Sequence, residues 1–175
     1  MRPLLLLTTL TFILSCKTST KKNDPDKWYK QMKDFILVES NLPADSSSIE
    51  YYVAGQKHKI KYYHKGFITT EKWYRESGEQ VLEIHYSNDQ QFELRKEIIC
   101  ESGQVSFEGV FYRKYSYGLS TWWNCDNQKE SEGIRYRDNR IGVWKTFDKN
   151  GDSTLTDYKK YNLIDSLQLI KKFDD

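Results

Sequence analysis

Three carboxylates, Glu83, Glu108 and Glu132, recur at a similar position in successive segments of this 175-residue chain. On neighbouring hairpins they would lie in a row, and two carboxyl groups about 5 to 9.5 Å apart in a cleft are the arrangement used by glycoside hydrolases. Acids that repeat along an exposed sheet face are more often solvated than catalytic. A carboxylate-based hydrolase is therefore an alternative, and the favoured prediction is a protein without catalytic residues that is not an enzyme.

The three histidines, His58, His64 and His85, have a spacing that matches no metal-binding motif. His64 precedes Lys65-Gly66 in a predicted turn, and His85 lies in a predicted strand. The chain also lacks a glycine-rich phosphate loop, a nucleophile elbow and a paired-cysteine metal motif. We therefore expect no metal and no cofactor.

The cysteines are Cys16, Cys100 and Cys125. If Cys16 is modified, the other two form an even pair in an oxidising compartment, where such pairs form disulfides. Cys100 aligns with Asn124, which places the pair on equivalent strands with one strand between them. Next-but-one strands lie about 9 to 10 Å apart, beyond the roughly 7 Å limit between the Cα atoms of a disulfide. A twisted or bulged end would close the gap, so both outcomes stay open.

Aromatic residues make up 15% of the chain, with 13 tyrosines, and this excess favours strands. Because aromatics are enriched in interface hot spots, some are candidates for a partner-binding face, with core packing as the alternative. Side chains alternate along a strand, so Trp122 and Trp144 are predicted to point away from the side of Trp123 and Phe147. The candidates are Tyr112, Trp122, Tyr136, Trp144 and Tyr158.

The N-terminus has the pattern of a secretory signal, because an apolar run from Leu4 to Leu14 follows Arg2 and is too short to span a bilayer. The run ends in Ile13-Leu14-Ser15-Cys16, which resembles a bacterial lipobox. That resemblance implies lipid attachment at Cys16 and cleavage before it, with an ordinary signal peptide as the alternative. Lys17 follows where an Asp would resemble an inner-membrane retention signal, so the expected location is the cell envelope, at the outer membrane where one exists.

The predicted organisation is a lipoprotein signal peptide over 1–15, a flexible tether over 16–26, a helix and linker over 27–49 and a repeat domain over 50–175. The whole chain carries 27 basic and 25 acidic residues, and removing the signal takes away only Arg2. This balance argues against nucleic acid as a partner, because binding phosphates needs a clustered basic excess. The expected partners are the membrane, through the lipid, and a protein.

An amphipathic helix is predicted after Asp24-Pro25-Asp26, which has the pattern of a helix start. Trp28, Met32, Phe35 and Ile36 then fall on one face, and the helix closes before Asn41-Leu42-Pro43. Repeat arrays need covered ends, so we expect this helix to cap the open end of the stack. A partner-binding or membrane-surface helix is the alternative.

A unit of about 24 residues returns at least four times between Lys72 and Tyr161. Within each unit a glycine such as Gly118 or Gly142 is predicted to open a short strand, and a polar turn leads to a second strand. One turn position admits only Gly or Asn, which predicts a left-handed backbone there. These positions are Gly78, Gly103, Asn127 and Gly151, with a fainter first copy around Gly55. The fold class is therefore all-β, an antiparallel β-hairpin repeat array with a short N-terminal helix.

The segment from Asn139 to Gly151, with Gly142, Trp144, Phe147 and Asn150-Gly151, resembles the MORN-like hairpin repeat, specifically its bacterial antitoxin-type variant. The resemblance is good over 118–161, moderate over 72–117 and absent before about 50. It implies a non-catalytic binding or scaffolding module. The sequence thus predicts a membrane-anchored, protein-binding lipoprotein, and one version of this prediction is an immunity or antitoxin-like protein. The alternative is an envelope scaffold or a glycan- or cell-surface-binding lipoprotein.

Overall fold

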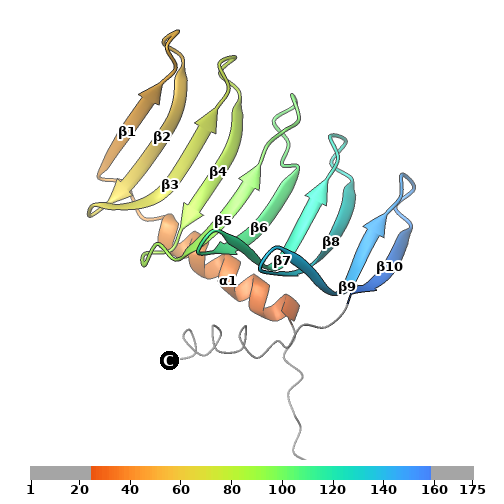
Figure 1. Cartoon of the computed structure of the whole chain (residues 1–175). Coiled ribbons are helices and arrows are strands. Elements are labelled where there is room, and N and C mark those ends of the chain that lie inside the picture. Colours follow the sequence, from red (N-terminus) through yellow and green to blue (C-terminus); the bar gives the residue numbers. More distant parts are fainter. Residues whose placement is uncertain (1–24, 159–175) are drawn as a thin grey trace, which may run out of the picture.

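The computed structural model describes residues 25–158, which form one ten-stranded antiparallel sheet with a helix across one of its faces (Figure 1). This confirms the predicted all-β hairpin array with a short N-terminal helix. The helix α1 spans Pro25–Ser40 and therefore ends before Asn41, as predicted. The strands are β1 (Ser46–Tyr51), β2 (Lys57–His64), β3 (Phe67–Tyr74), β4 (Gln80–Tyr86), β5 (Phe92–Glu97), β6 (Phe107–Tyr112), β7 (Tyr115–Trp123), β8 (Lys129–Tyr136), β9 (Asn139–Phe147) and β10 (Ser153–Tyr158).

The strands lie in the sheet in chain order, so each pairs with its sequence neighbours. Five-residue loops over 52–56, 75–79, 124–128 and 148–152 lie at one end of the sheet, at the top in Figure 1. We call this the loop end, and its remaining connection, 98–106, is the longest there. Two-residue turns over 65–66, 113–114 and 137–138 lie at the opposite end, which we call the turn end. The sheet is a continuous meander that starts with β1, upstream of the boundary expected at residue 50.

The recurring shape of the loops at the loop end comes from one left-handed residue in each loop. The φ angles are +91° at Gly55, +92° at Gly78, +75° at Gly103, +60° at Asn127 and +87° at Gly151. The N–H of each of these residues donates to the carbonyl three residues earlier, as a turn followed by a left-handed residue requires. The predicted left-handed positions are confirmed, and Gly55 belongs to the same series.

Three of the four connections at the turn end use a different turn, with positive φ at both residues, while the fourth, 87–91, has one left-handed residue, Gln90 (+57°). The pairs are Lys65 (+50°) with Gly66 (+83°), Arg113 (+47°) with Lys114 (+76°), and Arg137 (+48°) with Asp138 (+66°). Positive φ at both central positions is the signature of the type I′ hairpin turn, whose twist matches that of the strands it joins. Most of these residues are not glycine, so each such turn carries backbone strain of about 1 kcal/mol or more per non-glycine residue.

Gly118 and Gly142 lie inside β7 and β9, where the prediction that they open strands is wrong. Both have positive φ, +75° and +63°, and the pairing register shifts beside each of them. Such a residue forms a β-bulge, which bends the strand locally without ending it. The strands therefore begin three residues earlier than predicted.

The helix lies across the middle of the sheet and does not cap an end, so the expected capping role is wrong. It contacts β3 to β7 and runs across the strands, as Figure 1 shows. Its buried residues Met32 and Ile36 pack on Phe92, Leu94 and Val110, which form the hydrophobic core with it. These three strand residues lie side by side on β5 and β6, and this apolar patch is where the stripe of the helix removes most surface from water.

Residues before Pro25 lie outside the described part of the chain, and so does the predicted lipid attachment at Cys16. Within residues 25–158, no helix combines the length and the hydropathy needed to cross a membrane.

Candidate binding surface

The pairing register assigns every strand residue to one of two faces. The helix face carries α1, and the open face is the opposite one, over which no element within residues 25–158 lies. Trp122, Trp144 and Tyr158 lie on the open face, since Trp122 aligns through Ser131 with Thr146, two residues from Trp144. Tyr112 and Tyr136 lie on the helix face. The five predicted partner-binding aromatics are therefore divided between two surfaces.

On the helix face the aromatic rings pack into the core. Phe92 and Tyr112 lie 4.8 Å apart between ring centroids, Tyr112 and Tyr117 5.8 Å, and Tyr117 and Tyr136 5.3 Å. Phe92 and Tyr117 are buried, and Tyr112 packs against the cluster around Met32. Tyr112 thus contributes to the core, which is the alternative raised from the sequence, and Tyr136 continues its row.

The open face carries a continuous row of rings across five strands. The centroid distances are 6.1 Å for Phe111–Phe107, 4.8 Å for Phe107–Trp122, 5.5 Å for Trp122–Trp144 and 6.2 Å for Trp144–Tyr158. Trp144 is completely buried although it lies on the face without the helix, because its ring is seated on Gly133. Its Nε1–H donates to the carbonyl of Ile134 at 3.1 Å, which fixes the ring flat on the sheet. We call these five residues the aromatic row.

Cationic side chains cover the rings of the open face. The Lys59 ammonium lies 3.8 Å from the centroid of Trp73, and the guanidinium carbons of Arg95, Arg135 and Arg140 lie 4.0, 4.9 and 4.4 Å from Phe111, Trp122 and Trp144 respectively. Such cation–π contacts stabilise by about 0.5 to 2 kcal/mol, more when they are desolvated. The open face is thus a layer of rings under a layer of positive charge.

The positive charges near β1 to β6 are matched by carboxylates. Lys59 lies 3.6 Å from Glu50 and 3.5 Å from Glu71, and Arg95 lies 2.6 Å from Glu93. Glu71 also accepts a hydrogen bond from the Tyr86 hydroxyl at 2.8 Å, and burial together with this carboxylate raises the pKa of Tyr86. This half of the open face is internally neutralised.

The other half, on β8 and β9, is not neutralised in this way. Arg135 and Arg140 form no ion pair with a carboxylate of the described chain. Arg135 donates to the Asp138 carbonyl at 3.3 Å, and Arg140 donates to the Tyr158 hydroxyl at 3.1 Å. Burial lowers the pKa of Arg135, and the positive charge of Arg140 lowers it further. The Asp138 carboxylate opposes these two effects but does not outweigh them, so the two cations face each other with their charge only partly offset.

The three predicted carboxylates do form a row on the helix face. The register aligns Glu83 with Lys96, then Glu108, then Thr121, then Glu132, so each acid is separated from the next by one strand. Neighbouring acids therefore lie about 9 to 10 Å apart with another residue between them.

Each of these acids is held by cationic or hydrogen-bonding partners. Lys33 of α1 lies 2.5 Å from Glu108, and Lys129 lies 2.7 Å from Glu132. Burial raises the pKa of Glu132, but Lys129 and Lys145 outweigh it and the pKa falls below its usual value. The hydrogen bond from His85 lowers the pKa of Glu83 to about 2. A glycosidase acid needs a raised pKa, so this row does not have the arrangement of one.

A pocket of about 510 Å³ opens beside the C-terminal end of α1, over β2 to β4. Its wall includes Ser40, Glu83 and His85, and the Ser40 Oγ lies 3.1 Å from His85 Nδ1 while His85 Nε2 lies 2.8 Å from Glu83. In a serine, an imidazole and a carboxylate arranged in this order, the imidazole can take the proton of the serine while the carboxylate orients and stabilises the imidazole. The last turn of a helix presents carbonyl oxygens, however, and these repel the oxyanion that acyl transfer develops. We therefore assign the contacts of Ser40, His85 and Glu83 a structural role, which is to hold the C-terminal end of α1 against the sheet.

The remaining histidines have structural contacts. His58 packs against the rings of Tyr52 and Trp73, at 4.5 and 5.5 Å, and His64 Nδ1 lies 2.9 Å from the Pro43 carbonyl. Over the described residues no group of three His, Cys, Asp or Glu side chains is placed to hold a metal ion.

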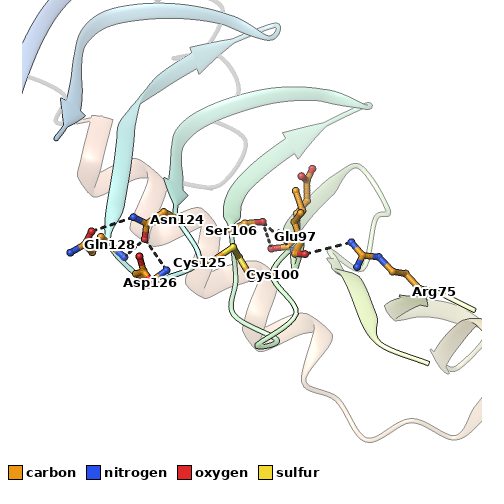
Figure 2. Close-up of a disulfide and its surroundings, with 9 residues drawn as sticks. Arg75, Glu97, Cys100, Ser106, Asn124, Cys125, Asp126 and Gln128 are labelled. Atoms are coloured by element: carbon orange, nitrogen blue, oxygen red, sulfur yellow. Dashed lines mark hydrogen bonds between the residues drawn. A yellow bond between two sulfur atoms is a disulfide. The ribbon is translucent and has the colours of Figure 1, made fainter. Parts of the chain in front are cut away.

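Cys100 and Cys125 form a disulfide at the loop end, with Cα atoms 5.4 Å apart (Figure 2). The predicted placement on strands is wrong, because Cys100 lies in the connection 98–106 and Cys125 in the loop 124–128. Because both cysteines lie in loops and not on paired strands, their Cα atoms are not held at the spacing of next-but-one strands. Asn124 closes its own loop by accepting from the N–H groups of Asp126 and Gln128, at 3.0 and 2.8 Å.

No family model and no curated protein matches this chain. Among solved structures, a crystal structure of a mutant of S. aureus TarM in complex with fondaparinux, α-GlcNAc-glycerol and UDP is similar to it, with a TM-score of 0.36 and 7% sequence identity. The match covers 74% of this chain and 24% of that one, so the chain spans about a quarter of the length of TarM in that structure. A likeness at this level carries no argument about function.

Proposed function

We propose that this protein is a bacterial lipoprotein, anchored in the envelope through Cys16, whose open face is a non-catalytic protein-binding surface. The observation that carries the proposal is the aromatic row under its arginines, on a face that no described element covers. Trp, Tyr and Arg are the residues most enriched in interface hot spots.

The arrangement of the sheet supports this role. Trp144 is fixed by a hydrogen bond to the backbone and by its seat on Gly133, so the row is ordered before a partner arrives. Binding then requires little further loss of side-chain freedom, which is the main advantage of a preorganised surface. The MORN-like resemblance adds an immunity or antitoxin-like role, and a scaffold of the envelope is the alternative.

Site-specific photocrosslinking in intact cells tests the proposal. Thr146 and Lys145 are adjacent exposed residues of β9 whose side chains point to the open face and the helix face respectively. A photoreactive amino acid at Thr146 should capture a discrete protein that the same group at Lys145 does not. A partner with toxin-like features makes this an immunity protein, and several envelope proteins make it a scaffold. Equal capture from both positions, or capture from neither, would contradict the proposal.

The anchor has a separate test. Cells fed an alkyne-tagged fatty acid should label the wild-type protein and leave Cys16→Ser unlabelled and released from the membrane fraction. Labelling that persists in the variant would rule out Cys16 as the attachment site.

A further inference from the structure

Two arginines of the open face stand directly opposite each other. Arg135 on β8 and Arg140 on β9 are register partners, so their side chains leave the sheet on the same face at adjacent strands. Like charges in directly opposed cross-strand positions destabilise a sheet. The pair therefore concentrates positive charge at one fixed place on the open face, between β8 and β9.

The two guanidinium groups are also held in position. Arg135 lies over Trp122 at 4.9 Å and Arg140 over Trp144 at 4.4 Å. Stacking on a ring occupies the flat side of a guanidinium and directs its N–H donors outward at the edge. One Nη1 donor of each arginine is used, on the Asp138 carbonyl and on the Tyr158 hydroxyl, and the other Nη donors have no hydrogen-bond partner among the described residues. The Nε of Arg135 is buried and has no acceptor within the described residues. The stacking contacts and the Nη1 hydrogen bonds fix the orientation of both guanidinium groups, so an acceptor at their edges would meet donors already oriented.

The rest of the open face provides an internal comparison. Lys59, Lys61 and Arg95 each lie within 3.6 Å of a glutamate on the same face. The nearest acid to the arginine pair in sequence, Asp138, instead accepts a hydrogen bond from the Ser116 N–H at 2.7 Å. Asp138 does act on Arg135, but burial and the charge of Arg140 outweigh it, and the pKa of Arg135 stays below its ordinary value. Among the described residues, the arginines of β8 and β9 are therefore less well neutralised than the cations of β2 and β5.

We propose that Arg135 and Arg140 form a binding site for a carboxylate, supplied by an Asp or Glu side chain of the protein that docks on the open face. The inference rests on the proposed function and names the chemistry of its partner. A carboxylate is planar and accepts two parallel hydrogen bonds from a guanidinium, so it fits donors presented at the edge of a stacked ring. The site holds two cations beside an aromatic row, which suits an acidic side chain with apolar neighbours better than a phosphate-rich ligand.

Tryptophan fluorescence of the full-length protein tests the site without the partner. A capped tetraglutamate peptide, titrated at constant ionic strength, should change the emission of Trp122 and Trp144 saturably. Arg140→Gln should weaken this binding at least tenfold. Arg95→Gln is the matched control, because it removes the same charge from an arginine that is also stacked on a ring but is paired with Glu93. It should bind the peptide as the wild type does.

Inorganic phosphate forms the second arm of the titration. Tighter binding of phosphate than of tetraglutamate would overturn the assignment to a carboxylate, and so would equal losses in Arg140→Gln and Arg95→Gln or no binding at all. Unfolding in urea without the peptide separates a binding site from a structural pair. Arg140→Gln should lower the midpoint no more than Arg95→Gln does, because each variant loses one guanidinium stacked on a ring and Arg140→Gln also relieves repulsion. A larger fall in Arg140→Gln would overturn the proposal.

Crosslinking from Thr146 distinguishes the two proposals. If Arg140→Gln abolishes capture of the protein partner, both stand. If capture persists unchanged in Arg140→Gln, the open face remains the binding surface and the carboxylate site fails. If the peptide binds but Thr146 captures no protein, Arg135 and Arg140 do bind carboxylates, but the proposed protein-binding function fails.

Discussion

Replacing Gly133 with alanine tests whether Trp144 really lies on the backbone of β8. A Cβ at this position would lie 2.3 Å from Trp144 Cδ2 and 2.5 Å from its Cγ and Cε2. The backbone of Gly133 is not left-handed, so the cost of alanine there is steric alone. The ring has little room to retreat, since Nε1 is bonded to Ile134 and Arg140 covers its other side.

Two routes bound the magnitude of this effect. Overpacking a core by one methyl group costs roughly 1 to 3 kcal/mol. Expelling the ring would forfeit the burial of some 150 to 250 Å², worth roughly 4 to 6 kcal/mol at about 25 cal/mol per Å². Overpacking costs less than expelling the ring, so we expect the ring to stay in place and Gly133→Ala to lower the free energy of unfolding by about 3 kcal/mol. For a domain of this size that lowers Tm by roughly 6 to 12 °C.

Urea denaturation of the purified full-length chain, followed by far-ultraviolet circular dichroism, measures this change. Gly109→Ala is a graded control, because its Cβ would meet the tip of the Phe107 ring at 2.7 Å, which can move aside. Gly78→Ala meets no atom within 4 Å and carries only the strain of its left-handed backbone. In a Trp144→Leu background the cost of Gly133→Ala should fall below about 1 kcal/mol. The seat of Trp144 is refuted if Gly133→Ala costs no more than Gly78→Ala, or costs the same with and without Trp144.

Three further predictions concern the disulfide, the helix and the acid row. Cys100→Ser with Cys125→Ser should lower the free energy of unfolding by roughly 3.5 kcal/mol, because the bond spans 25 residues; urea midpoints of the wild type that do not change with reductant would contradict this. Lys33→Met and Glu108→Gln should couple by about 1 kcal/mol in a double-mutant cycle, because their side chains are only 30% and 13% exposed; additive effects would show that the pair is not formed. The pKa of Glu83, about 2, lies below its ordinary value of 4.5, so the stability it contributes is complete above pH 4.5 and is lost as the pH falls towards 2. Glu83→Gln should flatten the urea midpoint against pH over that interval, and an unaltered slope would contradict the assignment.

The loop end could be predicted from the sequence because its signal is local. Gly78, Gly103, Asn127 and Gly151 mark the one position in each unit where a side chain is costly, and their φ angles are all positive. The turn end carried no such signal, since Arg113-Lys114 and Arg137-Asp138 adopt left-handed conformations without glycine or asparagine. Only the pairing of the flanking strands holds those residues there, and that pairing is a property of the whole sheet.

Features that depend on contacts between distant residues were predicted least well. The position of α1 depends on an apolar patch formed by Leu94 on β5 and Val110 on β6, and these two residues meet only through the pairing of the two strands. The alternation of Trp122 and Trp144 was correct, because it needs only the period of a strand. The arginine pair was missed, although the register of β8 and β9 could have suggested it once the hairpin turn at 137–138 was known.

The chain-order meander has a consequence for the sequence of events in folding. Every strand finds its partner within a few residues, so each hairpin can form as soon as its own segment has been synthesised. The helix is synthesised before all of them, yet its seat is built from β3 to β7, which end at Trp123. Its apolar stripe therefore stays exposed while more than half of the sheet is made. The first element of the fold to be synthesised is among the last to be buried, and during that interval it is the segment open to a chaperone.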